Sequence, residues 1–214
     1  MTTKKTEIQV LNQISPIGLK RFPPDKYHIS KDAAKPEAIL VRSQDMHGMT
    51  IPDSVRAIGR AGAGTNNVPV QALSLRGVPV FNAPGANANA VKELVLAGML
   101  MAVRNLPAAI GFVDSLSGDD QGLARRVEEG KKRFAGIELP NHTLGIIGLG
   151  RIGSIVADAA IKLGMNVLGY DPEITVDAAW SLPSQVKKAH SIEEVLRASH
   201  FVTLHVPLVE VTGT

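Results

Sequence analysis

The stretch that decides the fold is residues 143–171, TLGIIGLGRIGSIVADAAIKLGMNVLGYD. It opens with an apolar run, Leu144 to Ile147, that has the length and β-branched content of a buried strand. Apolar residues then recur at three- and four-residue spacing up to Gly164, which predicts a helix with a glycine stop. A second apolar strand, Val167 to Tyr170, ends at Asp171. The stretch therefore predicts a strand, a tight turn, a helix and a second strand.

The turn carries glycines in the spacing G-x-G-x-x-G, at Gly148, Gly150 and Gly153. The first permits a tight turn, the second lets a pyrophosphate approach the backbone, and the third lets the helix pack close to the sheet. The N–H groups and the dipole at the start of the helix favour an anion there. Asp171 follows at about the 20-residue offset at which a carboxylate accepts hydrogen bonds from a ribose diol. The combination predicts a dinucleotide site, because a turn that binds nothing would leave it unexplained.

The same acid indicates which dinucleotide is bound. A carboxylate at Asp171 repels a 2′-phosphate, and no Arg or Lys lies between Asp171 and Ser184 to receive one. The sequence therefore favours NAD over NADP as the cofactor.

Length and composition exclude several other classes. The chain has 214 residues, enough for one large domain or two small ones, and it contains no cysteine for disulfides, thiolate metal sites or thiol catalysis. The net charge of +3 is small and aromatic residues make up only 4%, so no nucleic-acid partner is predicted. The N-terminus lacks the apolar core of a signal peptide, and the apolar run Leu94 to Val103 is too short to span a bilayer. We therefore expect a soluble cytoplasmic protein with no membrane partner.

The N-terminal part alternates short strands with helices or loops, which predicts a small parallel sheet. Val68 to Leu75 is expected to form a short helix that Gly77 closes. The expected strands are Ile8–Leu11, Ala38–Val41, Val55–Gly59 and Val78–Phe81.

A long helix is predicted from Asn87 to Asn105, and because it is apolar almost all round we expect it to be buried. A more polar helix is expected within Ala108–Glu128, followed by a linker over Lys131–Leu139. Ser191 and Glu194 form a capping box that opens a further helix. Only three strands are clear after Thr143, whereas a complete doubly wound domain has about six. We therefore expect the natural chain to continue past Thr214.

Six motifs occur in the order found in the NAD-dependent D-2-hydroxyacid dehydrogenases, and the chain resembles that family over essentially its whole length. The segments Asn12–Pro16 and Val41–Ser43 look most like the phosphoglycerate dehydrogenase branch. The motifs are Arg42-Ser43, Gly59-Arg60-Ala61-Gly62 with Asn67-Val68, Asn82-Ala83-Pro84-Gly85, Gly148–Gly153, Tyr170-Asp171-Pro172 and His205-Val206-Pro207-Leu208.

The resemblance implies an α/β protein of two domains. Residues 1–90 would belong to a flavodoxin-like substrate domain, and residues 91–214 to an incomplete Rossmann-like, doubly wound NAD-binding domain that carries the contacts of a homodimer. The implied substrate is a small phosphorylated 2-hydroxy acid. The implied reaction is the reversible oxidation of 3-phosphoglycerate to 3-phosphohydroxypyruvate, the entry to serine synthesis.

The resemblance also implies substrate contacts for Arg42, Ser43 and Asn87. A guanidinium at the carboxyl end of a strand can bind an oxyanion bidentately, although a surface ion pair would explain Arg42 nearly as well. An Asn before a helix is most often a cap, and this is the alternative for Asn87.

On the cofactor side, Arg151 and Ile152 match family positions along the NAD phosphates and adenosine. Val206 and Pro207 match a loop that packs on the adenine side, and the alternative is a strand end closed by proline.

No catalytic residue and no metal ligand are predicted in this chain. The family's catalytic Arg, His and Glu match positions beyond Thr214, so we expect the chain alone to be inactive. His205 matches a family histidine that is not the catalytic one. The remaining histidines have no acidic partner at a telling spacing, and they are His28, His47, His142, His190 and His200.

Two other functions stay open at this point. A glyoxylate or hydroxypyruvate reductase of the same family would not need to recognise a substrate phosphate. A non-catalytic NAD-sensing module, like the family's corepressor relatives, would keep Gly148–Gly153 and Asp171 without turnover.

Overall fold

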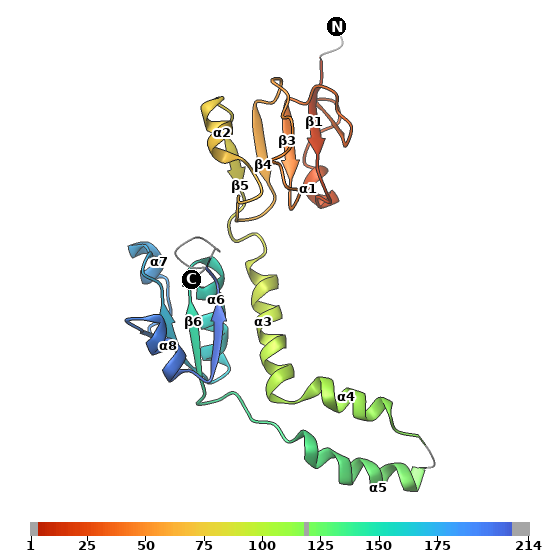
Figure 1. Ribbon diagram of the computed structural model, residues 1–214, viewed down its shortest axis with the longest axis vertical. Helices are drawn as coiled ribbons and strands as arrows, with labels where there is room; N and C mark the ends of the chain where they lie inside the picture. The colour runs from red at the N-terminus through yellow and green to blue at the C-terminus, as the bar shows by residue number, and fades with distance from the viewer. Residues whose placement is uncertain (1–3, 118–119, 207–214) are drawn as a thin grey trace. The chain divides into compact units, whose positions relative to one another are not determined.

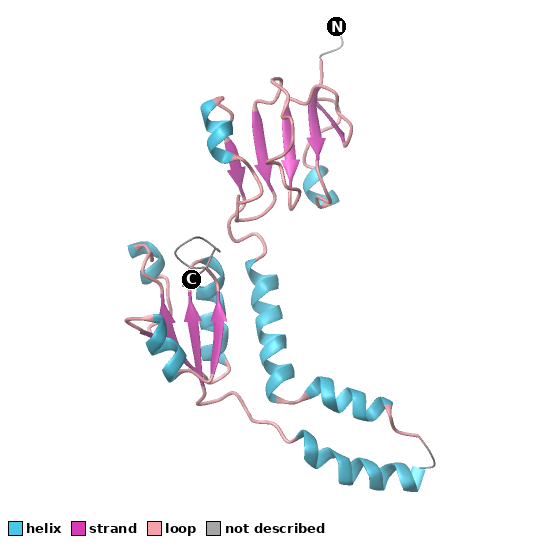
Figure 2. Cartoon of the chain, in the orientation of Figure 1, coloured by secondary structure: helices cyan, strands magenta, loops and turns pink. Residues whose placement is uncertain are grey.

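The computed structural model describes residues 4–117 and 120–206, and its contacts divide the chain into two compact units. Unit 1 is Met1–Ala86 and unit 2 is Asn87–Thr214, so the division falls close to the boundary at 90 that the sequence predicts. Each unit is built on its own parallel sheet (Figures 1 and 2). The predicted α/β fold class is confirmed.

The described part of unit 1 forms a five-stranded sheet in the order β2-β1-β3-β4-β5, with every neighbouring pair parallel. This is the flavodoxin-like order, in which the connections leave the first strand in both directions. The strands are β1 Thr6–Val10, β2 Tyr27–Ser30, β3 Ala38–Val41, β4 Ala57–Arg60 and β5 Val80–Asn82, with helices α1 Pro16–Leu19 and α2 Val70–Leu75.

One strand of unit 1 was not predicted. β2 has the sequence YHIS and lies at the edge of the sheet beside β1. An edge strand faces solvent on one side, so it needs no run of apolar residues to reveal it. The buried cluster lies instead on the central strands and α2, with Ile39, Ile58 and Leu73 in its interior.

Unit 2 begins with the helices α3 Ala88–Val103, α4 Leu106–Asp114 and α5 Asp120–Gly130 and the 3-10 turn η1 Lys131–Phe134. A parallel sheet follows, and its four described strands have the order β8-β7-β6-β9. This order is one part of the doubly wound arrangement. The remaining elements are β6 Thr143–Ile147, α6 Arg151–Lys162, β7 Asn166–Tyr170, α7 Val176–Trp180, β8 Val186–Lys188, α8 Ile192–Ala198 and β9 Phe201–Leu204.

The predicted helix of the glycine-rich unit is α6, and it ends as expected. Gly164 has φ +78°, and its N–H donates to the Ile161 carbonyl while the Met165 N–H donates to the Ala160 carbonyl. This is a Schellman motif, in which a left-handed glycine closes the helix. Ala160 and Met165 are both buried, so the turn also seals the core beneath α6.

The predicted cap of α8 is present with one change of partner. Ser191 Oγ accepts a hydrogen bond from the Glu194 N–H at 3.2 Å. The Glu194 carboxylate accepts from the N–H of His190, at 2.7 Å, rather than from that of Ser191. Both ends of the box therefore satisfy backbone donors at the start of the helix.

Helix α3 corrects the expectation that it is buried. It packs on α6 through Val95, Met99 and Val103, which join the core of unit 2. Its opposite side is open, and Leu94 is 73% exposed. A single helix offers α3 only one apolar stripe to pack against, so the rest of its apolar surface stays uncovered in the described residues.

No single described helix is long and apolar enough to cross a membrane. Helices α3 and α4 would reach that length together, but a bend of 65° separates them.

Candidate functional site

The strands of unit 2 bring the glycine-rich turn and the predicted acid to one edge of the sheet. Ile147 at the end of β6 is in register with Tyr170 at the end of β7 and with Leu204 at the end of β9. The next residues in each chain segment, Gly148 and Asp171 among them, therefore lie together at the carboxyl edge. In open α/β sheets, ligands bind at this edge.

A side chain would have a different effect at each of the three glycine positions. Gly148 has φ +91°, and a Cβ there would lie 2.7 Å from the His205 carbonyl oxygen. A Cβ on Gly153 would collide with the Gly148 carbonyl, so this glycine lets α6 start directly against the turn. Gly150 has φ −70°, and a Cβ there would meet no atom within 4 Å. The fold itself does not require Gly150, whereas a ligand approaching the backbone would.

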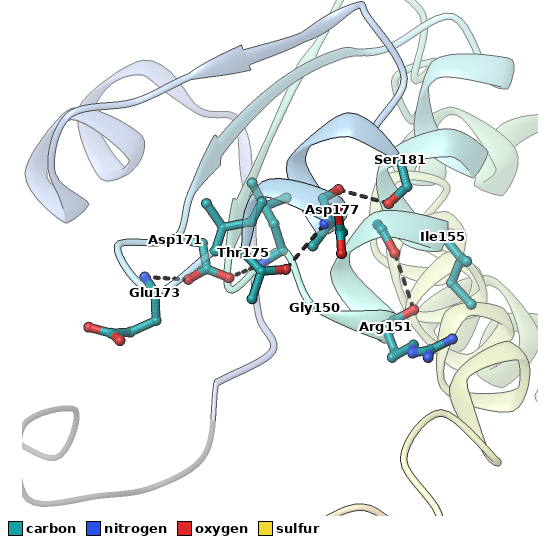
Figure 3. Close-up of a pocket in the computed structure, with 12 residues that line it drawn as sticks. Gly150, Arg151, Ile155, Asp171, Glu173, Thr175, Asp177 and Ser181 are labelled. Carbon is teal, nitrogen blue, oxygen red and sulfur yellow. Dashed lines mark hydrogen bonds between the residues drawn. The ribbon is translucent and has the colours of Figure 1, made fainter.

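Two backbone N–H groups fix the carboxylate of Asp171 beside the glycine-rich turn. Its Oδ2 accepts a hydrogen bond from the Leu149 N–H at 2.8 Å, and its Oδ1 accepts from the Glu173 N–H at 3.0 Å (Figure 3). A carboxylate has about four lone-pair positions, so both oxygens remain able to accept from a ribose diol. The carboxylate is thus oriented before any ligand arrives.

Gly150, Arg151 and Asp171 line one cavity of about 600 Å³ (Figure 3). Helix α7 supplies much of another wall, and Thr175 caps this helix by accepting from the Ala178 N–H at 3.2 Å. The cavity is also lined by residues that the sequence did not single out, namely Leu149, Ser154, Ile155, Glu173, Ile174, Thr175, Asp177, Ala178 and Ser181.

The charges around this cavity are unequal. Asp171, Glu173 and Asp177 contribute carboxylates, and Arg151 at the start of α6 is the single cation in the lining. The carboxylates oppose a phosphate on the adenosine ribose, whereas the helix N-terminus and Arg151 favour the pyrophosphate. The cavity therefore fits the ribose and pyrophosphate of NAD.

A second cavity, of about 490 Å³, lies on the β8 side of Asp171 and is lined by Lys187, Lys188 and His190. Lys187 and Lys188 belong to β8, which follows the range Asp171–Ser184 that contains no Arg or Lys to receive a 2′-phosphate. Strand pairing brings them close, since Gly169 on β7 is the register partner of Lys188. The sequence spacing alone gave no signal of this proximity.

The other predicted cofactor residues differ in position. Ile152 is half-buried and packs on the core of unit 2. Val206 is exposed, and its Cγ1 lies 2.8 Å from the place a Cβ on Gly148 would take. Pro207 lies outside the described residues.

Arg42 follows β3 in unit 1 and lines a cavity of about 770 Å³. Lys31, which follows β2, and Asn12, which follows β1, line the same cavity. The sequence did not single out Lys31, because it lies eleven residues before Arg42 and only the sheet order brings the two strand ends together. Ser43 is exposed and is not part of this lining.

Asn87 occupies the N-cap position of α3, but its side chain makes no capping hydrogen bond. The hydrogen bond that would support the alternative, in which Asn87 is only a helix cap, is therefore not formed. Lys131, a basic residue of the predicted linker, pairs with Glu128 three residues earlier on the same face.

Two histidines have acidic partners, contrary to the sequence reading. His28 Nδ1 lies 2.7 Å from Glu7 Oε2, because β1 and β2 place these residues opposite each other. His47 Nδ1 lies 2.8 Å from Asp45 Oδ1, and the backbone N–H of His47 lowers the pKa of that exposed carboxyl. Neither pair lines the cavities at Asp171 or Arg42.

His205 at the end of β9 is part-buried, and its Nε2 lies 3.0 Å from Thr203 Oγ1. Burial lowers its pKa below the ordinary value of 6.5. Among the described residues, no group of three or more His, Asp or Glu side chains is placed to hold a metal ion.

Comparison with protein families matches residues 96–214 to the profile described as D-isomer specific 2-hydroxyacid dehydrogenase, NAD binding domain. This match covers more than half of the chain. It also coincides with unit 2, where the glycine-rich turn lies.

Two curated relatives are called D-3-phosphoglycerate dehydrogenase. The one from Methanocaldococcus jannaschii is 42% identical over 156 residues, which is 73% of this chain and 27% of the relative. The one from Archaeoglobus fulgidus is 38% identical over 183 residues, which is 83% of this chain and 32% of the relative. The chain thus spans about a third of the length of these relatives or less.

A similar solved structure is the NAD⁺-bound 3-phosphoglycerate dehydrogenase of Entamoeba histolytica. It is 25% identical, with a TM-score of 0.67, and the match covers 98% of this chain and 65% of that one. The resemblance therefore extends through both units.

Proposed function

The chain belongs to the D-isomer specific 2-hydroxyacid dehydrogenase family, and we propose that it supplies the NAD site and the substrate-phosphate site for oxidation of 3-phosphoglycerate to 3-phosphohydroxypyruvate. The observation that carries the cofactor part is Gly150, whose small size nothing in the fold explains. The names of the relatives at 42% and 38% identity support the substrate part.

The residues of unit 2 have distinct tasks in this proposal. Gly148, Gly150 and Gly153 let the turn and the N-terminus of α6 approach the pyrophosphate, and Arg151 adds a positive charge there. Asp171, already held by two backbone N–H groups, receives the ribose hydroxyls. Ile152 is assigned to the same phosphate stretch. Val206 and Pro207, which follow His205 in the sequence, are assigned to the adenine side on the family resemblance. Bound NAD supplies the acceptor for the hydride that leaves C2 of the substrate.

Unit 1 binds the substrate phosphate in this proposal. Arg42 presents a guanidinium, which can hold a phosphate bidentately, and Lys31 adds a second cation to the same cavity. Ser43 contributes a polar contact to the rest of the substrate. Asn87, the first residue of unit 2, is assigned a substrate contact as well, and its side chain makes no capping hydrogen bond.

Oxidation of a secondary alcohol needs a base for the hydroxyl proton and a cation that holds the carboxylate. No histidine lines the cavity of Gly150 and Asp171 among the described residues. We therefore assign no catalytic residue within residues 4–117 and 120–206, and the acid/base group predicted from the family resemblance stays a prediction.

The substrate assignment is tested with Arg42→Ala in the natural protein, by following NADH with phosphorylated and unphosphorylated substrates. We expect kcat/KM for 3-phosphoglycerate to fall about a hundredfold, which corresponds to about 3 kcal/mol of a charge-assisted contact. Reduction of glyoxylate should change by less than about threefold. Equal losses for both substrates would contradict the phosphate role of Arg42 and would favour the reductase.

We also propose that unit 2 forms a homodimer through the open face of α3 and α4. Leu94 and Met101 on α3 and Ile110 and Val113 on α4 are exposed apolar side chains. Exposed apolar side chains that together form one surface are typical of a protein interface, and we propose that these four do so. The cytoplasm is the proposed location, as the sequence predicts, and fractionation of the source cells would test it.

A further inference from the structure

The loop that carries Arg42 is tied to the end of β1 by one asparagine. Asn12 has left-handed backbone, with φ +64°, directly after β1. Its Oδ1 accepts hydrogen bonds from the N–H groups of Ser43, at 3.2 Å, and Gln44, at 2.6 Å. Its Nδ2 donates to Gln44 Oε1 at 3.3 Å. One side chain therefore engages both backbone donors that follow Arg42.

A second asparagine engages the carbonyl groups of the same loop. Asn67 Nδ2 donates to the carbonyl of Gln44 at 2.7 Å and to that of Arg42 at 3.3 Å. The backbone carbonyl of Asn67 accepts a hydrogen bond from the Met46 N–H at 2.9 Å, which fixes the next part of the loop as well. Asn12 and Asn67 come from separate segments, and their hydrogen bonds converge on residues 42–44.

The arrangement has a feature that stability alone does not favour. Asn67 Oδ1 is buried, and none of the described residues offers it a hydrogen bond. An unsatisfied buried acceptor lowers stability. The orientation that lets Asn67 Nδ2 donate to two carbonyls therefore leaves Oδ1 without a donor at a cost in stability. The orientation is explained if holding the carbonyls of Arg42 and Gln44 in place has a use of its own.

We propose that Asn12 and Asn67 are positioning residues for Arg42, which hold the backbone of residues 42–44 so that the guanidinium meets the substrate phosphate without first ordering the loop. The side-chain hydrogen bonds of Asn12 and Asn67 given above go to the loop at residues 42–44 and not to the guanidinium of Arg42. Both asparagines therefore act through the backbone of the loop. A loop ordered in advance binds more tightly, since less conformational freedom is lost on binding. The inference rests on the phosphate role proposed above for Arg42.

The test uses the chain with Asn12→Gly, which accepts a positive φ and removes only the carboxamide, and with Asn67→Ala. Asn66→Ala, an exposed neighbour, is the control for Asn67. Asn105→Gly is the control for Asn12, because Asn105 is also left-handed, with φ +50°, and its Nδ2 donates to the Ala135 carbonyl. Calorimetric titration with 3-phosphoglycerate gives the affinity, and amide hydrogen exchange reports the loop.

We expect Asn12→Gly to raise exchange at the Ser43 and Gln44 amides about tenfold and to weaken 3-phosphoglycerate about fivefold, with NAD affinity unchanged. Asn67→Ala should weaken 3-phosphoglycerate similarly, and neither control should. In an Arg42→Ala background, Asn12→Gly should weaken binding less than it does in the original chain, because most of its effect passes through Arg42. If Asn12 had a purely structural role, Asn12→Gly would lower the affinity for 3-phosphoglycerate by its full factor in that background too.

The outcomes separate the two proposals. The full loss of Asn12→Gly, added unchanged in the double variant, or unchanged exchange at Ser43 and Gln44, would overturn the positioning role while the function of Arg42 stands. Increased exchange with no effect of Arg42→Ala on 3-phosphoglycerate would overturn the proposed phosphate role, and the positioning role with it.

Discussion

At the scale of single residues, Asp171 links the sheet to the turn that is proposed to meet the cofactor. Its carboxylate accepts from the Leu149 N–H within the glycine-rich turn and from the Glu173 N–H two residues on. The side chain that is proposed to receive the ribose therefore also holds the turn that is proposed to receive the pyrophosphate. A substitution at this position changes both, and only the choice of nucleotide isolates its charge.

We predict that Asp171→Asn lowers the ratio of NAD affinity to NADP affinity at least about tenfold, equal to about 1.4 kcal/mol. The amide oxygen still accepts from the Leu149 N–H, but the charge that opposes a 2′-phosphate is gone, and Lys188 lies on the neighbouring strand. Titration with both nucleotides measures the ratio. Asp177→Asn is the control in the same cavity, and an unchanged ratio in Asp171→Asn would show that another group selects the nucleotide.

The spacing of the sequence predicted the residues that neighbour one another along the chain. Gly148, Gly150 and Gly153 occupy a single turn, so their pattern could be read directly. Lys31 and Arg42 share a cavity only because β1 lies between β2 and β3, and a parallel sheet order is not written in local spacing. The pairing of His28 with Glu7 also depends on the sheet order, so the sequence spacing did not predict it.

At the scale of elements, the two strands that the sequence did not reveal are both at sheet edges. β2 and β8 end the orders β2-β1-β3-β4-β5 and β8-β7-β6-β9. Their residues are mostly exposed or half-exposed, with Lys187 and Lys188 in β8. A central strand such as β6 is buried over most of its length and shows a continuous apolar run. β5 also ends its sheet, but the apolar run Val78–Phe81 revealed it, so the hydrophobic pattern misses only those edge strands that lack such a run.

The end of β9 gives a prediction about pH. Burial lowers the pKa of His205 in the folded chain, so the unfolded chain, with the ordinary value of 6.5, takes up the proton first as pH falls. This histidine therefore leaves stability intact above about pH 7 and removes stability as the pH falls below the unfolded value. We expect His205→Gln to reduce the loss of unfolding free energy between about pH 7 and 5 in urea titrations.

His190→Gln, at an exposed histidine of the same unit, serves as the control. Parallel pH profiles for the original chain and His205→Gln would contradict the account of His205.

At the scale of the whole molecule, each unit has its own buried cluster. Ile39, Ile58 and Leu73 belong to that of unit 1, and Leu144, Val156 and Val167 to that of unit 2. Within unit 2, α3 carries apolar side chains that its packing on α6 leaves exposed, and α4 carries further exposed ones. A surface of this kind is expected to find a partner in solution.

We predict that Leu94→Lys or Ile110→Lys shifts a dimer toward the monomer, because a charge replaces an apolar contact on the proposed face. Sedimentation velocity at a fixed concentration measures the shift. Leu75→Lys is the matched control, since Leu75 is 92% exposed but belongs to α2 of unit 1. If the dimer persists in both unit 2 variants, the interface lies elsewhere. If the original chain is a monomer, the proposed dimer does not exist.

The central claim is that the turn at Gly148–Gly153 holds NAD, and the most direct measurement is the NAD affinity of the chain beside that of Gly150→Ala. An alanine at Gly150 meets no neighbour within 4 Å and needs no unusual φ, so the unfolding free energy should change by less than about 1 kcal/mol. The methyl group would occupy the space that the pyrophosphate needs, and we predict at least about a tenfold loss of affinity with the fold intact. Equal affinities in the two chains, or an original chain that does not bind NAD, would contradict the claim.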